Sequence, residues 1–204
     1  MRKIFTLLFT LMFAYTMQAQ EIKLTLNNGN VVSGTTKSLF MYDNSYEITV
    51  KDSKTEEKKD YSSADVKSVK YFNEKEKKWI TFVPLMAQKC MPSIWNKSPK
   101  PYKNPVFMSP LYEGKRVSAY MHMISTQTNT KKLQISGSGC IYYFLVKGEN
   151  VAKAFWMSSA IGVKAMLKIV FKDYPEMKPI IKELDTDKFY EDPLMIIREF
   201  DEAK

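Results

Sequence analysis

Apolar and polar residues alternate over most of the first half of the chain, as they do in strands with one buried face. Turn-forming residues such as Asn27-Asn28-Gly29-Asn30 separate the alternating runs. Pro84 should end the last run, because proline cannot donate a hydrogen bond to a neighbouring strand. The expected strands are residues 21–26, 31–40, 46–50, 60–61, 66–72 and 79–83. Short strands at this close spacing predict a small, strongly bent β-barrel.

The second half is organised around an unbroken apolar run, residues 140–146, which predicts a strand buried on both faces. Side chains alternate between the faces of a strand, so Phe144 and Tyr143 should enter different layers. Further strands are expected at residues 107–111, 116–124, 133–138 and 151–156, which together make an antiparallel meander. The polar residues 125–132 are expected to form a loop, and Ser136-Gly137-Ser138-Gly139 a flexible turn.

Apolar residues recur at intervals of three and four after residue 158, which predicts helices lying on one face of the meander. A helix from about 159 to 172 should bury Phe171 and leave its lysines in solvent, and a helical segment follows Pro175. Asp192-Pro193 is a good start for a final helix, 194–202. The predicted class is α+β, with an SH3/Sm-like barrel followed by a helix-covered antiparallel meander.

Residues 24–34, Leu-Thr-Leu-Asn-Asn-Gly-Asn-Val-Val-Ser-Gly, resemble the first motif of Sm-like and SH3-like barrels. The resemblance implies a barrel, and in Sm proteins the turn at Asp43 and Asn44 would approach uridine bases. The Arg-Gly or Lys-Gly pair that completes the RNA pocket in that family is replaced here by Ser62-Ser63-Ala64-Asp65. An RNA-binding role is therefore a third choice, and nucleic acid is not an expected partner.

The order of hairpin, helix, Lys172-Asp173-Tyr174-Pro175-Glu176-Met177 and terminal helix resembles small exported proteins of unknown function from Bacteroidetes-type bacteria. Gln18-Ala19-Gln20 resembles the end of their signal segments. This resemblance implies export and carries no activity with it.

Residues 1–19 have the order of a secretory signal peptide: Arg2 and Lys3, an apolar core, then Ala19 before the expected cleavage point. The apolar core, residues 4–15, is shorter than the roughly 20 residues that span a bilayer, so no transmembrane segment is expected. We expect a secreted or periplasmic protein. The net charge of +9 includes Arg2 and Lys3, so the exported chain would carry +7, which suits an anionic partner.

The chain then divides into a signal peptide (1–19), a small β-barrel-like module (20–84), a proline-rich linker (85–105) and an antiparallel sheet with C-terminal helices (106–204). Lys97, Lys100 and Lys103 recur at spacing three in the linker, and a polyproline II helix would place them on one edge. With Trp95 and Tyr102 as apolar contacts, they form a candidate binding strip. The alternative is a linker wrapped on the surface.

Few residues on this chain suit catalysis. His122 is the only histidine, so a histidine-based metal site is excluded within one chain, and we expect no metal or cofactor. A protease pair of Cys140 with His122 is disfavoured because Cys140 begins a buried strand. Cys90 and Cys140 could form a disulfide after export, or remain two small unpaired hydrophobic residues.

These patterns favour an exported, non-enzymatic binding or structural protein of the bacterial cell envelope. Its partner would be an anionic envelope polymer or a protein. The alternative is a hydrolase that uses scattered carboxylates in a cleft between the two modules.

Export makes a direct prediction: the mature protein should begin at or near Gln20. Intact-mass measurement of the native protein checks it, with the full-length chain expressed without export as the reference. A native chain that retains residues 1–19 would contradict the prediction.

Overall fold

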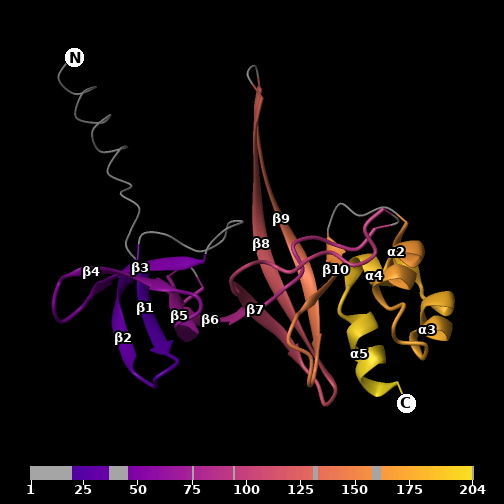
Figure 1. The fold of residues 1–204 in the computed structure, drawn as a ribbon, viewed down its shortest axis with the longest axis horizontal. Coiled ribbons are helices and arrows are strands. Elements are labelled where there is room, and N and C mark those ends of the chain that lie inside the picture. Colours follow the sequence, from indigo (N-terminus) through magenta and orange to yellow (C-terminus); the bar gives the residue numbers. More distant parts are fainter. Residues whose placement is uncertain are drawn as a thin grey trace.

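The computed structural model describes residues 20–36, 46–74, 76–93, 95–130, 133–157 and 162–203, and over residues 123–139 only the backbone. The signal segment and the turn with Asp43 and Asn44 lie outside these residues. The protein is α+β, as the sequence predicts: an antiparallel sheet with helices at its C-terminal end (Figure 1).

Ten strands form one sheet in the order β10-β9-β8-β7-β6-β5-β1-β2-β3-β4. The N-terminal strands are β1 (Gln20–Leu26), β2 (Val31–Thr36), β3 (Glu47–Asp52), β4 (Lys58–Ser62), β5 (Val66–Asn73) and β6 (Lys78–Leu85). The remaining strands are β7 (Val106–Glu113), β8 (Val117–Thr130), β9 (Leu133–Val146) and β10 (Lys153–Met157).

The sheet is not closed, so the expected barrel is not confirmed. β4 and β10 are its two ends, and no strand of the described chain pairs them. Pro84 does not end β6 as expected: the strand continues to Leu85 and pairs with β7, with Pro84 opposite Phe107. This pairing joins the N-terminal strands to the C-terminal meander. The side chain of Phe107, from β7, also packs among the buried residues of the N-terminal core.

Strand β9, which contains the apolar run 140–146, separates two packed layers, as the alternation of its side chains predicts. Phe144 lies in the cluster formed with the helices, and Tyr143 lies in a second cluster on the opposite face. The helices are α2 (Val163–Val170), α3 (Met177–Glu183), α4 (Thr186–Glu191) and α5 (Met195–Glu202). The final helix is confirmed, but its N-cap is Leu194 and not Asp192 as expected. The Asp192 Oδ1 accepts a hydrogen bond from the Leu194 N–H (3.2 Å) just before the helix begins.

The segment between β6 and β7 packs on the Tyr143 face of the sheet. Ala87 is fully buried and bridges Ala152, and the Tyr143 hydroxyl donates to the Gln88 carbonyl (3.2 Å). The Tyr102 N–H donates to the Ala87 carbonyl (2.8 Å), which brings the two ends of the segment together. These residues therefore form part of the second core cluster.

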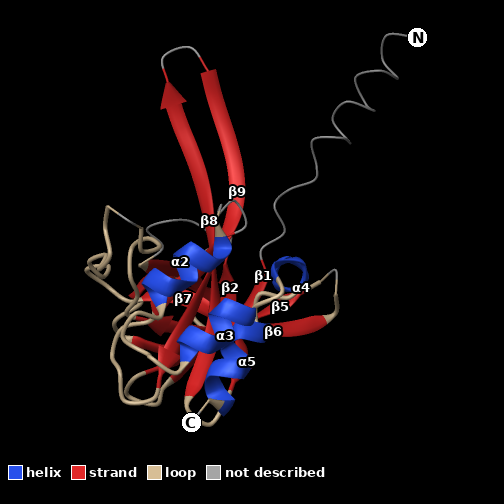
Figure 2. Cartoon of the chain, turned by 90° about the vertical axis from the view of Figure 1, so that its right-hand side faces the viewer, coloured by secondary structure: helices blue, strands red, loops and turns tan. Residues whose placement is uncertain are grey.

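Two local expectations were wrong in the β8–β9 hairpin. Residues 125–130 continue β8 instead of forming a loop, and the Ser-Gly repeat at 136–139 lies inside β9 instead of forming a turn. The strands pair without interruption from Val117↔Val146 to Thr130↔Leu133. Because cross-strand pairing supplies the backbone hydrogen bonds, polar residues can extend both strands beyond the apolar run. The hairpin rises well above the body of the protein (Figures 1 and 2).

The aromatic contact between strand and helix layer yields a stability prediction. Phe144 stacks on Phe171 with ring centroids 4.9 Å apart, and both side chains are buried. Phe144→Ala and Phe171→Ala should each cost about 3 to 5 kcal/mol of unfolding free energy. The double variant should lose less than the sum, since the two deletions share one cavity.

Denaturant melts of the two single variants and the double variant measure these costs. Lys168→Ala, at an exposed position of α2, is the control and should cost less than about 0.5 kcal/mol. Near-wild-type stability of Phe144→Ala would show that this contact does not hold the layers together.

Candidate functional site

Trp95 is the most exposed large apolar side chain of the described residues, at 90 %. It belongs to a tight turn in which Ser93 and Asn96 exchange backbone hydrogen bonds of 2.9 and 3.2 Å. The Ser93 hydroxyl also accepts from the Asn96 N–H (3.0 Å). The turn is thus fixed by its own hydrogen bonds, and it presents the indole to solvent.

The rest of the candidate strip divides between surface and core. Lys97, Lys100 and Lys103 are all exposed, as the binding hypothesis requires. Tyr102 is only 7 % exposed, and its hydroxyl donates to the Lys89 carbonyl (3.2 Å). Tyr102 therefore anchors the strip to the protein and does not offer its ring to an external ligand.

Beside this strip, helices α2 and α3 enclose a concavity of about 370 Å³. Its apolar floor comes from Phe171 and Ile181, both buried. Its rim carries four exposed lysines, which we call the lysine rim: Lys168, Lys172, Lys178 and Lys182. Lys178 and Lys182 are four residues apart on α3, which places them on one side of the hollow, whereas Lys168 and Lys172 come from α2 and the turn that follows it.

The charges of the lysine rim are not engaged in ion pairs: none of its four ammonium groups pairs with a carboxylate in the described part of the chain. Lys178 and Lys182 lie four residues apart on α3, and like charges at that spacing destabilise a helix by about 0.2 to 0.5 kcal/mol. The rim therefore keeps a local repulsion that a bound anion would relieve.

One contact ties the rim to the strip. The Lys172 ammonium donates to the Ser98 hydroxyl (3.0 Å), which lies next to Lys97 in the chain. The whole segment from residue 86 to residue 112 contains no aspartate or glutamate. Strip and rim together therefore make one basic surface, with Trp95 at its edge.

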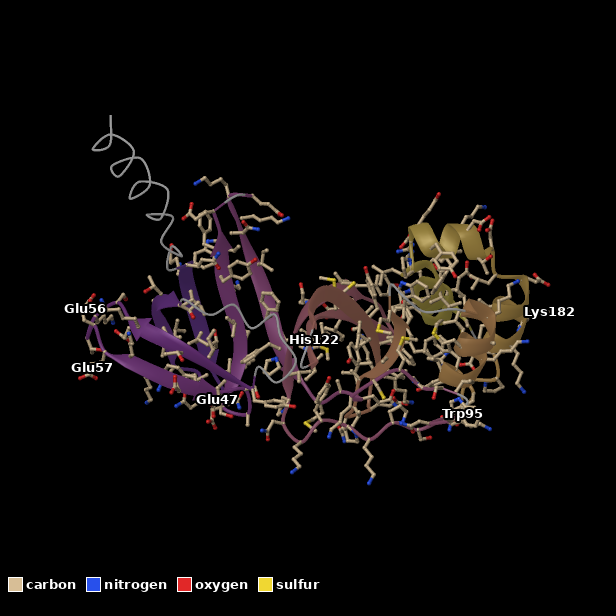
Figure 3. All side chains as sticks on the ribbon, turned by 90° about the horizontal axis from the view of Figure 1, so that it is seen from above. Glu47, Glu56, Glu57, Trp95, His122 and Lys182 are labelled. Carbon is tan, nitrogen blue, oxygen red and sulfur yellow. The ribbon has the colours of Figure 1, made fainter. Side chains whose placement is uncertain are left out.

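Figure 3 shows that this surface lies at one end of the molecule. Trp95 and Lys182 lie at the end that carries the helices, whereas Glu47, Glu56 and Glu57 lie toward the opposite end. The basic surface thus lies far from these three acidic side chains.

Sequence patterns identified the strip but not the rim. The sequence predicts that the lysines of α2 form a solvated face, and it gives no prediction for the lysines of α3. The helical spacing of Lys168 with Lys172, and of Lys178 with Lys182, was a usable signal. It could not show that the two pairs face each other, because that depends on how α2 packs against α3.

The structure separates His122 from Cys140. His122 is opposite Ile141 and Cys140 is opposite Met123, so the two residues belong to opposite faces of the hairpin. The His122 ring lies in the core, with Nδ1 3.2 Å from the Phe107 carbonyl oxygen. Cys90 and Cys140 are both free thiols, so the possible disulfide is not formed. No group of metal-ligating side chains occurs among the described residues.

A larger hollow, lined by carboxylates, lies at the C-terminal end of α5, with a volume of about 850 Å³. Asp201 lies in its wall, together with Glu113 and Glu202. The Asp201 carboxylate accepts hydrogen bonds from the backbone N–H groups of residues 115–117, at 2.7 to 3.0 Å, and from the Tyr112 hydroxyl at 3.0 Å. This carboxylate therefore fastens α5 to the turn between β7 and β8.

The environment of Asp201 keeps it ionised. Burial by itself would raise the pKa, but the N–H groups of Arg116, Lys115 and Val117 and the Tyr112 hydroxyl outweigh it and lower the pKa to about 2. Nearby, Arg116 pairs with Glu176, which lowers the pKa of that carboxyl as well. Neither group can hold a proton near neutral pH, so neither suits the role of a general acid.

The Asp201 contacts predict acid sensitivity. Asp201→Ala should cost about 2 to 4 kcal/mol at pH 7, because several donors lose their acceptor. Folding lowers the pKa of this carboxyl, so its contribution is complete above about pH 4 and is lost as the pH falls toward 2. Urea melts at pH 7 and at pH 2.5 should show the gap between wild type and variant narrowing in acid. A gap that does not change with pH would contradict this assignment.

Gly114 provides a second readout of the same contact. A Cβ at this position would collide with the Asp201 carboxylate. Gly114→Ala should therefore destabilise the wild type more than it destabilises the Asp201→Ala protein. Equal costs in the two backgrounds would show that the carboxylate is not held against the turn.

No helix among the described residues is long and apolar enough to cross a bilayer. No protein-family model matches the chain, and no curated protein or solved structure is similar enough to count as a match.

Proposed function

We propose that this chain is an exported, non-enzymatic binding protein of the bacterial cell envelope that holds an anionic polymer on its basic surface. The observation that carries the proposal is the lysine rim: four exposed ammonium groups around an apolar floor, none of which pairs with a carboxylate of the described residues. The neighbouring Lys97, Lys100 and Lys103 extend the same charge along the surface. Trp95 adds an exposed aromatic face at its edge.

The size of each contact favours a polymer over a small ligand. An exposed ion pair contributes about 0.2 to 1 kcal/mol, so a single anionic group would be held weakly. A chain that places several anionic groups along the rim and strip adds these contributions within one binding event. Such binding weakens as salt screens the charges, over a Debye length of about 8 Å at physiological ionic strength.

The N-terminal module does not need to take part. We interpret it as a relative of SH3/Sm-like folds, supported by the strand order β5-β1-β2-β3-β4 and the turn at residues 63–65 before β5. Asn27 fastens that turn through its side-chain amide, which donates to the Ala64 carbonyl (2.7 Å). The Sm-like RNA pocket is incomplete in sequence, so the proposal assigns no nucleic acid to this module.

The hydrolase alternative requires two carboxylates that act on one bond, one of them protonated near neutral pH. Asp201 is the carboxylate with the most hydrogen-bond donors in the larger hollow, and those donors hold it ionised. Its role as a structural fastener is the one that its contacts support.

A charge-matched pair of variants tests the binding proposal. The first changes the lysine rim: Lys168→Gln, Lys172→Gln, Lys178→Gln and Lys182→Gln. The control changes four exposed lysines of the N-terminal strands and turns: Lys54→Gln, Lys58→Gln, Lys67→Gln and Lys70→Gln. Both variants lose four charges, so only the position of the loss differs.

Binding to polygalacturonate, an anionic polysaccharide, should be measured by calorimetry at 50 and 300 mM salt, with neutral dextran as the negative control. The rim variant should bind at least tenfold more weakly at low salt, and the control variant should change by less than about threefold. Equal losses in both variants would mean that net charge, and not the rim, drives binding. Failure of the wild type to bind any polyanion would refute the proposal.

A further inference from the structure

The β8–β9 hairpin forms an arm that extends beyond the rest of the sheet (Figure 2). Strand β7 accompanies β8 only as far as Met121, and β10 accompanies β9 only as far as Ile141. Beyond these points residues 123–130 and 133–140 pair with each other alone. We call these sixteen residues the arm, and both of its edges lack a neighbouring strand within the described chain.

An arm of this kind leaves many backbone groups exposed. In an antiparallel pair, about half of the N–H and C=O groups of each strand point away from the partner, which is about eight groups per edge here. A two-stranded ribbon on its own is at best marginally stable in water. A third strand at one edge would supply partners for those groups and stabilise the arm.

The two end strands of the sheet, β4 and β10, have features that hinder pairing with a further strand, and the arm lacks these features. β4 has only five residues, and three of them are the charged Lys58, Lys59 and Asp60. β10 also has five residues, its ladder with β9 shifts register between Ala154 and Trp156, and α2 packs against it. The arm strands contain no charged residue and no proline. They therefore lack the charged side chains and the proline that often prevent pairing at an exposed edge.

We propose that the β8 edge of the arm pairs with the β8 edge of a second copy of this chain, in antiparallel orientation, to form one four-stranded sheet. β8 is the better edge because Ile124, Thr126, Thr128 and Thr130 are β-branched and favour extended backbone. β9 carries Gly137 and Gly139, which weaken a strand.

Charge favours a second copy as the partner, and strand geometry favours the antiparallel orientation. Two identical β8 edges carry no like charges that would face each other, whereas an acidic partner would find no basic side chain along the strand. β8 already pairs antiparallel with β7 and with β9. Antiparallel strands also pair slightly more stably per residue than parallel strands do.

A two-fold axis also closes the assembly. Antiparallel pairing of identical strands uses the same surface on both copies, so the product is a dimer and not an open filament. This distinguishes the proposal from aggregation at an unprotected edge, in which chains add without limit.

Sedimentation velocity of the purified protein from 1 to 100 μM tests the association. The wild type should sediment as a dimer at the high end. A variant in which residues 124–139 are replaced by Asn-Gly, a two-residue turn that joins Met123 to Cys140, should be monomeric throughout. Its melting temperature should stay within a few degrees of the wild type, because the described core clusters contain none of the removed residues. A monomeric wild type at 100 μM would overturn the proposal, and so would a well-folded short-arm variant that still dimerises.

Oxidative cross-linking tests the edge and the orientation in the complete arm. In a Cys90→Ser, Cys140→Ser protein, single cysteines are placed by Met123→Cys, Thr126→Cys, Gln127→Cys and Ser136→Cys. Antiparallel β8 pairing predicts efficient disulfide-linked dimers for Thr126→Cys or Gln127→Cys, which lie nearest the two-fold axis, and few for Met123→Cys. Equal cross-linking at positions 123 and 127 would indicate parallel pairing, and preferential cross-linking at 136 would indicate the β9 edge. Either result would overturn the proposal.

Discussion

The packing of Phe144 holds the C-terminal half together. Its ring stacks on Phe171 and meets the rings of Phe155, Tyr174 and Phe200 edge-on, at centroid distances of 5.9 to 6.1 Å. These partners come from β10, from the C-cap of α2 and the turn that follows it, and from α5, so one strand residue contacts three parts of the fold. Aromatic pairs of this geometry add about 0.5 to 1.5 kcal/mol each beyond the area they bury. The helix layer therefore depends on the central strand for its position.

The basic surface depends on both layers of that strand. On the helix side, Phe171 and Ile181 fix the turns that carry the lysine rim. On the opposite side, Tyr143 and Tyr102 lie in one cluster and hold the chain between β6 and β7 against the sheet. The Lys172–Ser98 hydrogen bond then joins the rim to the strip. Charges far apart in the sequence thus come to lie on one surface because apolar residues bind their segments to a common sheet.

The sequence was informative where one side-chain period dominates. Alternation placed Phe144 and Tyr143 in different layers, and Asp192-Pro193 located the start of the last helix. The sequence was not informative where backbone pairing or tertiary packing decides the local structure. Ser125 and Thr126 show no apolar period, and only the partner strand reveals that they are extended. Tyr102 was expected at the surface because spacing three suggested a solvated polyproline helix, whereas its backbone pairs with Ala87 and its ring enters the core.

The proposed basic surface and the proposed dimer contact of the arm would both strengthen binding of a polymer. The rim and strip lie on the body of the protein, and the arm projects from it, so dimerisation through β8 would leave both basic surfaces open. Two such surfaces on one particle would bind a long anionic polymer with an effective concentration set by their separation, which strengthens binding without any new contact. A polymer makes many weak contacts and can reach both surfaces of one dimer, so its binding gains more from dimerisation than that of a small ligand, which occupies one surface alone. The arm therefore gives a physical reason why weak, exposed lysine contacts can suffice for a protein that holds a polymer.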